Sequence, residues 1–320
     1  MRNRFTTTTR LLLATLAGIA MASCDSGAPW TEEAPEETQS PREDFGPSAA
    51  YDRLMLLVAP APAPESTTAA IFDFAAVRES ASFRRGARVR TLAEGDWTAQ
   101  MDAGWEMSPM REPWRLVPYG DLTVVVGEEG EVDALTVRGE APLRLEPGSA
   151  MTEYMPDGST RLLLRQGRLT IGDTVVTGTL LDSQHGRALD GDVTATSPAP
   201  SARPGVEALL LDNTGFFVVF APTAGGDLAW VTTAGQSDVR RGARLEPVDW
   251  EADEIAGDSV PATWRVASAG PTLSGELSTV SADHTQLDDG AARLSYVLVS
   301  GWIQDREVRR EVSGLVRQIR

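Results

Sequence analysis

The chain offers few side chains with the chemistry of a catalytic or metal site. Its two histidines, His185 and His284, lie in the polar segments "DSQHGRA" and "SADHTQLDD". A zinc site needs three or four His, Cys or carboxylate ligands at short spacing, and neither histidine has such companions nearby in the sequence. We therefore expect two solvated loop histidines, and neither a metal ion nor a cofactor.

Motifs for other reactions are equally weak. The segments "DGD" (190–192) and "DDG" (288–290) resemble fragments of a calcium-binding loop, but neither continues to a glutamate ligand. No nucleophile elbow, phosphate-binding loop or dinucleotide-binding glycine pattern occurs at a strand-to-helix junction. Because no motif supports a Ser/His/Asp triad either, the sequence favours binding over catalysis.

Tryptophans and neighbouring arginines are the remaining candidate site residues. They recur in the same order in the two halves of the chain, as Trp97, Trp114 and Arg115 and then as Trp250, Trp264 and Arg265. Such residues can line a ligand cavity through aromatic and cation–π contacts. Alternatively, each tryptophan closes the base of a small barrel while the arginine covers its ring. Recurrence in both halves favours this structural role.

The elements that position these residues are β-strands. The segment "LLLDNTGFFVVFAP" (209–222) has two β-rich runs separated by Asn-Thr-Gly, which predicts a hairpin. About eight such strands follow one another in 206–320, and 67–182 has the same pattern. No segment keeps a helical period of 3.6 residues over a comparable length. The sequence therefore predicts an all-β protein made of antiparallel barrels or sandwiches.

An internal duplication is indicated by repeated segments. Arg-Arg-Gly-Ala-Arg stands at 84–88 and again at 240–244, and the recurring tryptophans follow each copy. Each half closes with a Val-x-Gly strand, "VVTGTL" (175–180) and "EVSGLV" (311–316). We therefore predict two β domains in which 84–116 and 240–266 are equivalent strands.

The N-terminus indicates export. Arg2, Arg4 and Arg10 precede the apolar run 11–22, and the only cysteine, Cys24, follows within "MASC". This is the pattern of a signal peptide that ends in a lipidated cysteine, and the apolar run is too short to span a bilayer. We expect a lipoprotein anchored in the cell envelope through Cys24, in a leaflet that the sequence leaves open.

Composition divides the chain into five segments. Two stretches rich in proline and polar residues resemble linkers, because they cannot bury enough apolar surface to fold. The expected organisation is a signal peptide (1–23), a lipidated acidic tether (24–49), a first barrel domain (50–193), a linker (194–205) and a second barrel domain (206–320). The net charge of −17 argues against nucleic acid as a partner, since phosphate contact needs a basic surface.

The second half resembles a known family. The run "VPATWRVAS…TLSGEL…YVLVSGWIQDREVRREVSGLVRQI" is similar to the two-domain, lipocalin-like family that includes carotenoid 1,2-hydratases. The resemblance implies tandem calycin-type β-barrels and an apolar ligand. The family often ends in a Gly-Tyr-Val-Glu-like strand, where this chain has Gly314, Leu315, Val316 and Arg317. Because the polar motif positions are altered, the resemblance implies no catalytic residue here.

Three functions are compatible with these features. We expect foremost a binding protein for a hydrophobic small molecule or lipid, because eight-stranded barrels can hold one such ligand. The alternatives are an envelope module that binds protein or glycan, and a hydratase or isomerase acting on an isoprenoid-like substrate. A ligand binder needs an apolar cavity, an enzyme needs a buried acid in that cavity, and an interaction module would have filled barrels.

Overall fold

The computed structural model describes residues 49–78, 83–108, 115–127, 131–188, 205–253, 258–268, 272–287 and 292–320. The predicted signal peptide, Cys24 and Trp114 lie outside these residues. The same holds for all but the last residue of the predicted tether and of the predicted linker.

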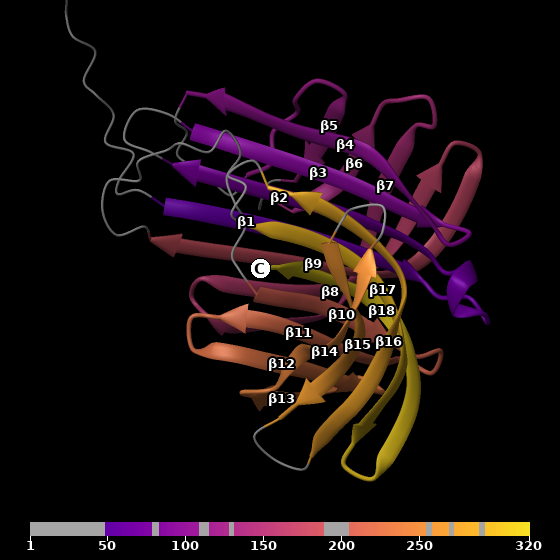
Figure 1. The fold of residues 1–320 in the computed structure, drawn as a ribbon. Helices are drawn as coiled ribbons and strands as arrows, with labels where there is room; N and C mark the ends of the chain where they lie inside the picture. Colours follow the sequence, from indigo (N-terminus) through magenta and orange to yellow (C-terminus); the bar gives the residue numbers. More distant parts are fainter. Residues whose placement is uncertain are drawn as a thin grey trace, which may run out of the picture. The chain divides into compact units, whose positions relative to one another are not determined.

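The first half of the described chain forms one nine-stranded antiparallel sheet (Figure 1). Its strands are β1 (Ala49–Ala59), β2 (Thr68–Arg78), β3 (Phe83–Ala93), β4 (Asp96–Met107), β5 (Leu122–Val126), β6 (Val132–Val137), β7 (Leu143–Asp157), β8 (Thr160–Ile171) and β9 (Thr174–Ala188). A short 3-10 turn, η1 (Pro64–Ser66), joins β1 to β2.

The second half forms another nine-stranded antiparallel sheet. Its strands are β10 (Gly205–Leu211), β11 (Phe216–Thr223), β12 (Gly226–Thr233), β13 (Gln236–Arg241), β14 (Arg244–Asp253), β15 (Asp258–Ala267), β16 (Leu273–Gln286), β17 (Arg293–Asp305) and β18 (Val308–Ile319). The predicted hairpin is β10–β11. Asp212 holds its turn by accepting hydrogen bonds from the main-chain N–H groups of Thr214 and Phe216, at 2.7 and 3.0 Å.

The two sheets have the same topology. The strand order is β4-β3-β2-β1-β9-β8-β7-β6-β5 in the first and β13-β12-β11-β10-β18-β17-β16-β15-β14 in the second. Each strand of the first sheet thus has a counterpart nine strands later. In both sheets the first and last strands pair at the centre, so the meander curls into a barrel that is open between its fourth and fifth strands. This confirms the predicted all-β class and the tandem, duplicated domains.

The segments that suggested the duplication are not all equivalent. Residues 84–88 lie within β3, whereas 240–244 span the end of β13, a turn and the start of β14. The counterpart of β3 is β12, so the predicted equivalence of 84–116 with 240–266 is wrong. The Val-x-Gly endings do correspond, because they lie on β9 and β18. A side chain at Gly178 would clash with the carbonyl oxygen of Val58, and one at Gly314 with that of Leu209.

Both faces of the central strands are buried. On β1, Met55 and Leu57 pack inside the first barrel, whereas Leu54 and Leu56 pack in a cluster that contains residues of both sheets. We call these the inner face and the interdomain face. The second barrel has its own inner cluster, which includes the fully buried Trp264.

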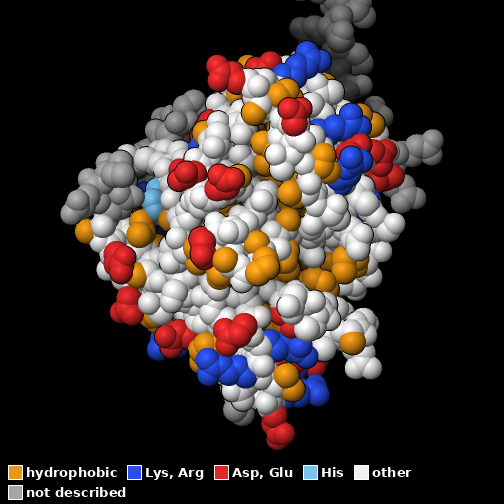
Figure 2. Space-filling model, turned by 90° about the vertical axis from the view of Figure 1, so that its right-hand side faces the viewer, with side chains coloured by type: hydrophobic (Ala, Val, Ile, Leu, Met, Phe, Trp, Pro, Cys, Tyr) orange, Lys and Arg blue, Asp and Glu red, His pale blue; other side chains and the backbone are white. Residues whose placement is uncertain are grey.

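The surface is mixed in charge. On the face drawn in Figure 2, hydrophobic side chains lie across the middle, and acidic and arginine side chains occur together toward both ends. The net negative charge is therefore not collected into one patch on this face.

Candidate functional site

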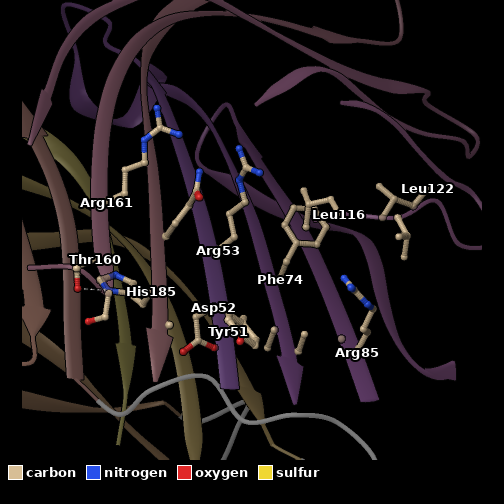
Figure 3. Close-up of a pocket in the computed structure, with 18 of the residues that line it drawn as sticks. Tyr51, Asp52, Arg53, Phe74, Arg85, Leu116, Leu122, Thr160, Arg161 and His185 are labelled. Carbon is tan, nitrogen blue, oxygen red and sulfur yellow. Dashed lines mark hydrogen bonds between the residues drawn. The ribbon is translucent and has the colours of Figure 1, made fainter. Parts of the chain in front are cut away.

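The inner side of the first sheet borders a partly open cavity of about 240 Å³. Its apolar wall includes Phe74, Ala76, Trp105, Leu116, Leu122 and Met155. Its polar wall includes Tyr51, Asp52, Arg53, Arg85, Thr160, Arg161, Gln184 and His185. In Figure 3, Arg85 lies on the side of Leu116 and Leu122, and Thr160 and His185 lie at the opposite end of the view.

Cross-strand pairing explains why there is space. One row of neighbours across the sheet consists of Gly186, Tyr51, Ala76, Arg85 and Trp105, on β9, β1, β2, β3 and β4. Side chains directly opposite each other share a face of a sheet. Because Gly186 and Ala76 have small side chains, the row leaves room between its larger members.

The next row brings further arginines to the same face. It consists of Arg161, Gln184, Arg53, Phe74 and Ala87, on β8, β9, β1, β2 and β3. The cavity wall is thus partly apolar and partly cationic. Such a wall offers contacts to both apolar and polar groups.

The three arginines of the wall differ in their surroundings. Arg53 donates two hydrogen bonds to the carboxylate of Asp182, at 2.9 and 2.6 Å, and both side chains are buried. Arg161 forms an ion pair of 2.7 Å with Glu153, near the surface. These two arginines are therefore paired with carboxylates.

Arg85 is the arginine beside the apolar wall. Its Nη1 donates a hydrogen bond of 2.9 Å to the main-chain carbonyl of Arg115, and its guanidinium lies 5.3 Å from the ring centroid of Phe83. Burial lowers the pKa of Arg85 to about 10. The guanidinium stays charged at neutral pH, but its surroundings disfavour that charge.

An aromatic stack lies between the two edge strands of this domain. Trp105 on β4 stacks on Tyr119, which precedes β5, with ring centroids 4.3 Å apart and an angle of 4° between the rings. Leu116 and Leu122, on either side of Tyr119 in sequence, line the cavity. The stack therefore borders the cavity at the open side of the sheet.

A second polar cluster lies on the interdomain face. Asp73 of β2 accepts hydrogen bonds from Arg317 Nε at 2.7 Å and from the Tyr296 hydroxyl at 2.8 Å, both on the second sheet. Arg317 also lies 3.6 Å from Glu207 of β10. All four side chains are almost fully buried. The cluster therefore joins the two domains with charges removed from water.

The ionisation states follow from these contacts. Burial, followed by the charge of Asp73, raises the pKa of Tyr296 well above its usual value, so its hydroxyl remains a donor. Burial alone would lower the pKa of Arg317 and raise that of Glu207. In Arg317 the charges of Asp73 and Glu207 outweigh burial. In Glu207 the charge and hydrogen bond of His185, together with Arg317, outweigh it and lower the pKa.

Ser183, His185 and Glu207 extend this cluster, but they do not form a catalytic triad. His185 Nε2 lies 2.8 Å from Ser183 Oγ and 3.0 Å from Glu207 Oε1, and Ser183 also donates to Glu207. In a triad, the nucleophile and the carboxylate bind opposite nitrogens of the imidazole. Here both bind Nε2, while Nδ1 faces Thr160 Oγ1 at 3.3 Å.

The tryptophans singled out by the sequence do not meet at one site. Trp97 is half-buried and packs against the apolar cluster of the interdomain face. Trp250 is 40% exposed and lies beneath the guanidinium of Arg320. Trp264 is buried in the second barrel, and its Nε1 donates to Thr279 Oγ1 at 3.2 Å. None of these three lines the first-domain cavity.

The arginines that follow two of them also have other roles. Arg115 contributes its carbonyl to Arg85 and has an exposed side chain. Arg265 is 63% exposed and lies 3.8 Å from Glu246. Neighbours on a strand point to opposite faces, so Arg265 does not cover the ring of Trp264 as expected.

The prediction of solvated loop histidines is wrong. His185 lies on β9 and is buried, and His284 lies on β16 with Nδ1 2.9 Å from Ser295 Oγ. Sequence reasoning also missed Arg85 as a cavity residue, although it belongs to the first Arg-Arg-Gly-Ala-Arg segment. The sequence did contain a signal for this position. Ala87 and Val89, which lie on the same face of the strand as Arg85, are apolar, as expected of a face that points into a barrel.

Two findings concern metals and membranes. Within the described residues, no three His, Cys, Asp or Glu side chains come together as a metal site. In that same part of the chain, no helix has the length and hydropathy needed to cross a bilayer.

Comparison with known proteins identifies the fold. No family model and no curated protein sequence matches the chain. A crystal structure described as a candidate AttH protein from Nitrosomonas europaea matches with a TM-score of 0.55 at 10% identity, over 89% of this chain and 97% of the other. It supports a lipocalin-like fold with two barrel domains.

Two further structures match less well. Kievitone hydratase from Nectria haematococca has a TM-score of 0.48 at 13% identity, over 84% of this chain and 87% of its own. CghA has a TM-score of 0.36 at 12% identity, over 85% and 88%.

Proposed function

We propose that this protein binds a small hydrophobic molecule in the cavity of its first β domain, and that it does so at a membrane surface to which Cys24 anchors it. The observation that carries the binding proposal is the cavity itself, which is partly open and is lined on one side by Phe74, Trp105 and Leu122. Concave sites with mostly apolar walls and a few polar groups are the usual form of small-molecule sites.

Small residues at the cavity support this proposal. The inner face of the first barrel carries Ala76 and Gly186 at the cavity. The second barrel also has a hollow of about 240 Å³, which Phe220, Leu228 and Leu245 line. The interaction-module alternative would favour filled barrels, so these hollows favour a small ligand.

The binding proposal is tested by filling the cavity. Ala76→Phe places a ring between Tyr51 and Arg85, its neighbours across the sheet. We expect isothermal titration calorimetry to detect 1-octanol binding to the full folded chain, and Ala76→Phe to abolish it. The matched control, Ala252→Phe at an exposed position of β14, should bind as the wild type does. Equal binding by all three proteins would contradict the proposal.

The anchor is tested separately. Cys24→Ser should abolish incorporation of labelled fatty acid and release the protein from the membrane fraction, because a single cysteine would carry the whole attachment. Labelling that persists in the variant would exclude the lipoprotein.

The second candidate function is a hydratase or isomerase that acts on an isoprenoid-like molecule. One observation favours it: His185 is a buried imidazole beside the cavity, and Glu207 from the second domain holds its ring on the interdomain face. A general acid or base needs such a fixed imidazole within reach of its substrate. Incubation of bound ligands in heavy water, followed by mass spectrometry, should then show deuterium uptake that His185→Gln abolishes. Unlabelled ligand would argue for binding alone.

A further inference from the structure

We propose that the open end of the first-domain cavity docks on the surface of the membrane to which Cys24 is attached. The occupant of this docking surface is the lipid bilayer itself, in contact with exposed apolar side chains around the opening. The inference rests on the proposed lipid anchor and cavity. It adds which face of the protein meets the lipid.

The opening lies at one end of the first barrel. Of the residues that border the cavity, Met155, Gly158 and Ser159 are exposed, and we call the part of the cavity beside them the mouth. The carbonyl of Ser159 accepts a hydrogen bond of 2.8 Å from the main-chain N–H of Gly186, near the end of β9. Gly186 in turn pairs with Tyr51, near the start of β1. The mouth is therefore at the end of the barrel where β1 begins.

The chain that leads to Cys24 joins the barrel at this same end. Ala49 begins β1 and precedes Tyr51 of the cavity by two positions, or about 7 Å of strand. Only the segment 25–48 separates Ala49 from Cys24. A flexible linker of about 25 residues has an average span of about 25–30 Å. A lipid on Cys24 would therefore hold the mouth close to the bilayer.

The opposite end of the same barrel is farther from the anchor. Strand β9 runs the length of the barrel, from Thr174 to Ala188. Val175, near its start, is separated from Gly186 at the mouth by about 35 Å of extended strand. This distance exceeds the average span of the linker. The anchor therefore favours contact between the mouth and the bilayer over contact at the opposite end.

The surroundings of the mouth are apolar and aromatic. Met155 is 61% exposed, although its side chain is apolar. The stack of Trp105 on Tyr119 also borders the cavity, and Tyr119 is another of the exposed large apolar side chains. Exposed apolar side chains that gather at one place mark contacts with a membrane or a protein. Tryptophan and tyrosine in particular favour the interface between lipid and water.

The acidic side chains beside the mouth already have partners. Glu153 forms an ion pair of 2.7 Å with Arg161. Asp157 accepts hydrogen bonds from the main-chain N–H groups of Ser159 and Ala224, at 2.8 and 3.3 Å. The net charge of −17 nevertheless repels anionic lipid head groups. We therefore expect docking on zwitterionic lipid, through apolar contact.

The experiment locates single labelled positions of the anchored protein relative to the lipid. Because Cys24 is the only cysteine, a cysteine introduced into the lipidated protein is its only free thiol. Met155→Cys at the mouth and Val175→Cys at the opposite end each carry a fluorophore, and the protein is reconstituted into phosphatidylcholine vesicles. The two positions are matched, because both are apolar strand residues that are exposed, at 61% and 48%.

The two labels should respond in opposite ways. Spin-labelled phosphatidylcholine quenches on contact, so the fluorophore at 155 should lose most of its emission and the one at 175 should keep it. Iodide in the buffer should quench the fluorophore at 175 and spare the one at 155. Ser159→Cys, in the exposed turn at the mouth, should behave as Met155→Cys does and covers the case in which that variant fails to fold. Added phosphatidylglycerol should not increase the quenching by lipid.

The outcomes separate this inference from the function on which it rests. A label at 155 that iodide reaches and the lipid quencher does not would overturn the docking surface and leave the anchor and the cavity standing. A label shielded from both quenchers would also overturn it, because a protein surface, such as a second copy of the chain, would then cover the mouth. Equal quenching by lipid at 155 and 175 would exclude a preferred face. If Cys24 carries no lipid, the anchor and this inference fail together.

Discussion

Replacing Arg317 with methionine tests the idea that buried charges hold the two domains together. The side chain is 4% exposed, and it lies 2.7 Å from Asp73 and 3.6 Å from Glu207. Methionine has a similar length but cannot neutralise either carboxylate. Removing one partner of a buried ion pair typically costs about 3–5 kcal/mol, because the other charge remains buried without compensation.

That cost is large for this protein. Typical unfolding free energies are about 5–15 kcal/mol, so the variant should lose a large share of the total. With roughly 2–4 °C per kcal/mol for a chain of this size, its melting temperature should fall by about 6–20 °C. Chemical denaturation followed by circular dichroism gives the free energy directly. Arg309→Met is the matched control, because Arg309 lies on the same strand, is 56% exposed and lies 3.9 Å from Glu311. Its guanidinium also lies over Trp302, 4.2 Å from the ring centroid, so the change should cost about 1 kcal/mol or less.

A double variant separates the charge from the packing. Adding Asp73→Asn to Arg317→Met removes one of the two carboxylate charges that lose their arginine partner, while an amide oxygen can still accept the hydrogen bond of Tyr296. The double variant should therefore lose less stability than the sum of the two single variants. A loss below about 1 kcal/mol in Arg317→Met, or strict additivity in the double variant, would refute the reasoning.

Two further predictions concern the cluster and the second barrel. Because the pKa of Glu207 is lowered in the folded protein, its contribution to stability is present above the ordinary value of 4.5 and is lost as the pH falls through the folded value. In urea titrations at several pH values, the difference between wild type and Glu207→Gln should therefore shrink below pH 4.5, and a constant difference would contradict the shift. Trp264→Ala should cost about 3–5 kcal/mol by leaving a void in the second barrel, whereas the exposed Arg265→Ala should cost about 0.5 kcal/mol or less. Similar melting temperatures for these two variants would show that Trp264 does not support the core.

The sequence alone determined the fold class and part of the duplication. Alternating apolar runs joined by turn residues predict antiparallel strands, and the Asn-Thr-Gly hairpin at β10–β11 forms as expected. The glycines at 178 and 314 correspond because a local steric rule requires them: the neighbouring strand leaves no room for a side chain. Such local constraints can be predicted from the sequence.

The tertiary structure decided what the repeated segments do. In this chain both faces of a central strand are buried. The alternation of side chains along a strand shows that Arg85 and Arg88 lie on different faces, but it does not show which face holds a cavity. Arg85 borders the first-domain cavity, while its counterpart in the second copy, Arg241, is exposed at the end of β13. The repeated Arg-Arg-Gly-Ala-Arg segment therefore does not mark structurally equivalent positions.

The candidate sites also depend on pairing that no local pattern specifies. The cavity row joins Tyr51 of β1 to Gly186 of β9, and the interdomain cluster joins Asp73 to Arg317 across 244 residues. The register between the first and last strands of each barrel, and the packing of one sheet on the other, bring these residues together. Sequence spacing determines neither the strand register nor the packing of the sheets, because both result from the burial of apolar surface by the whole chain.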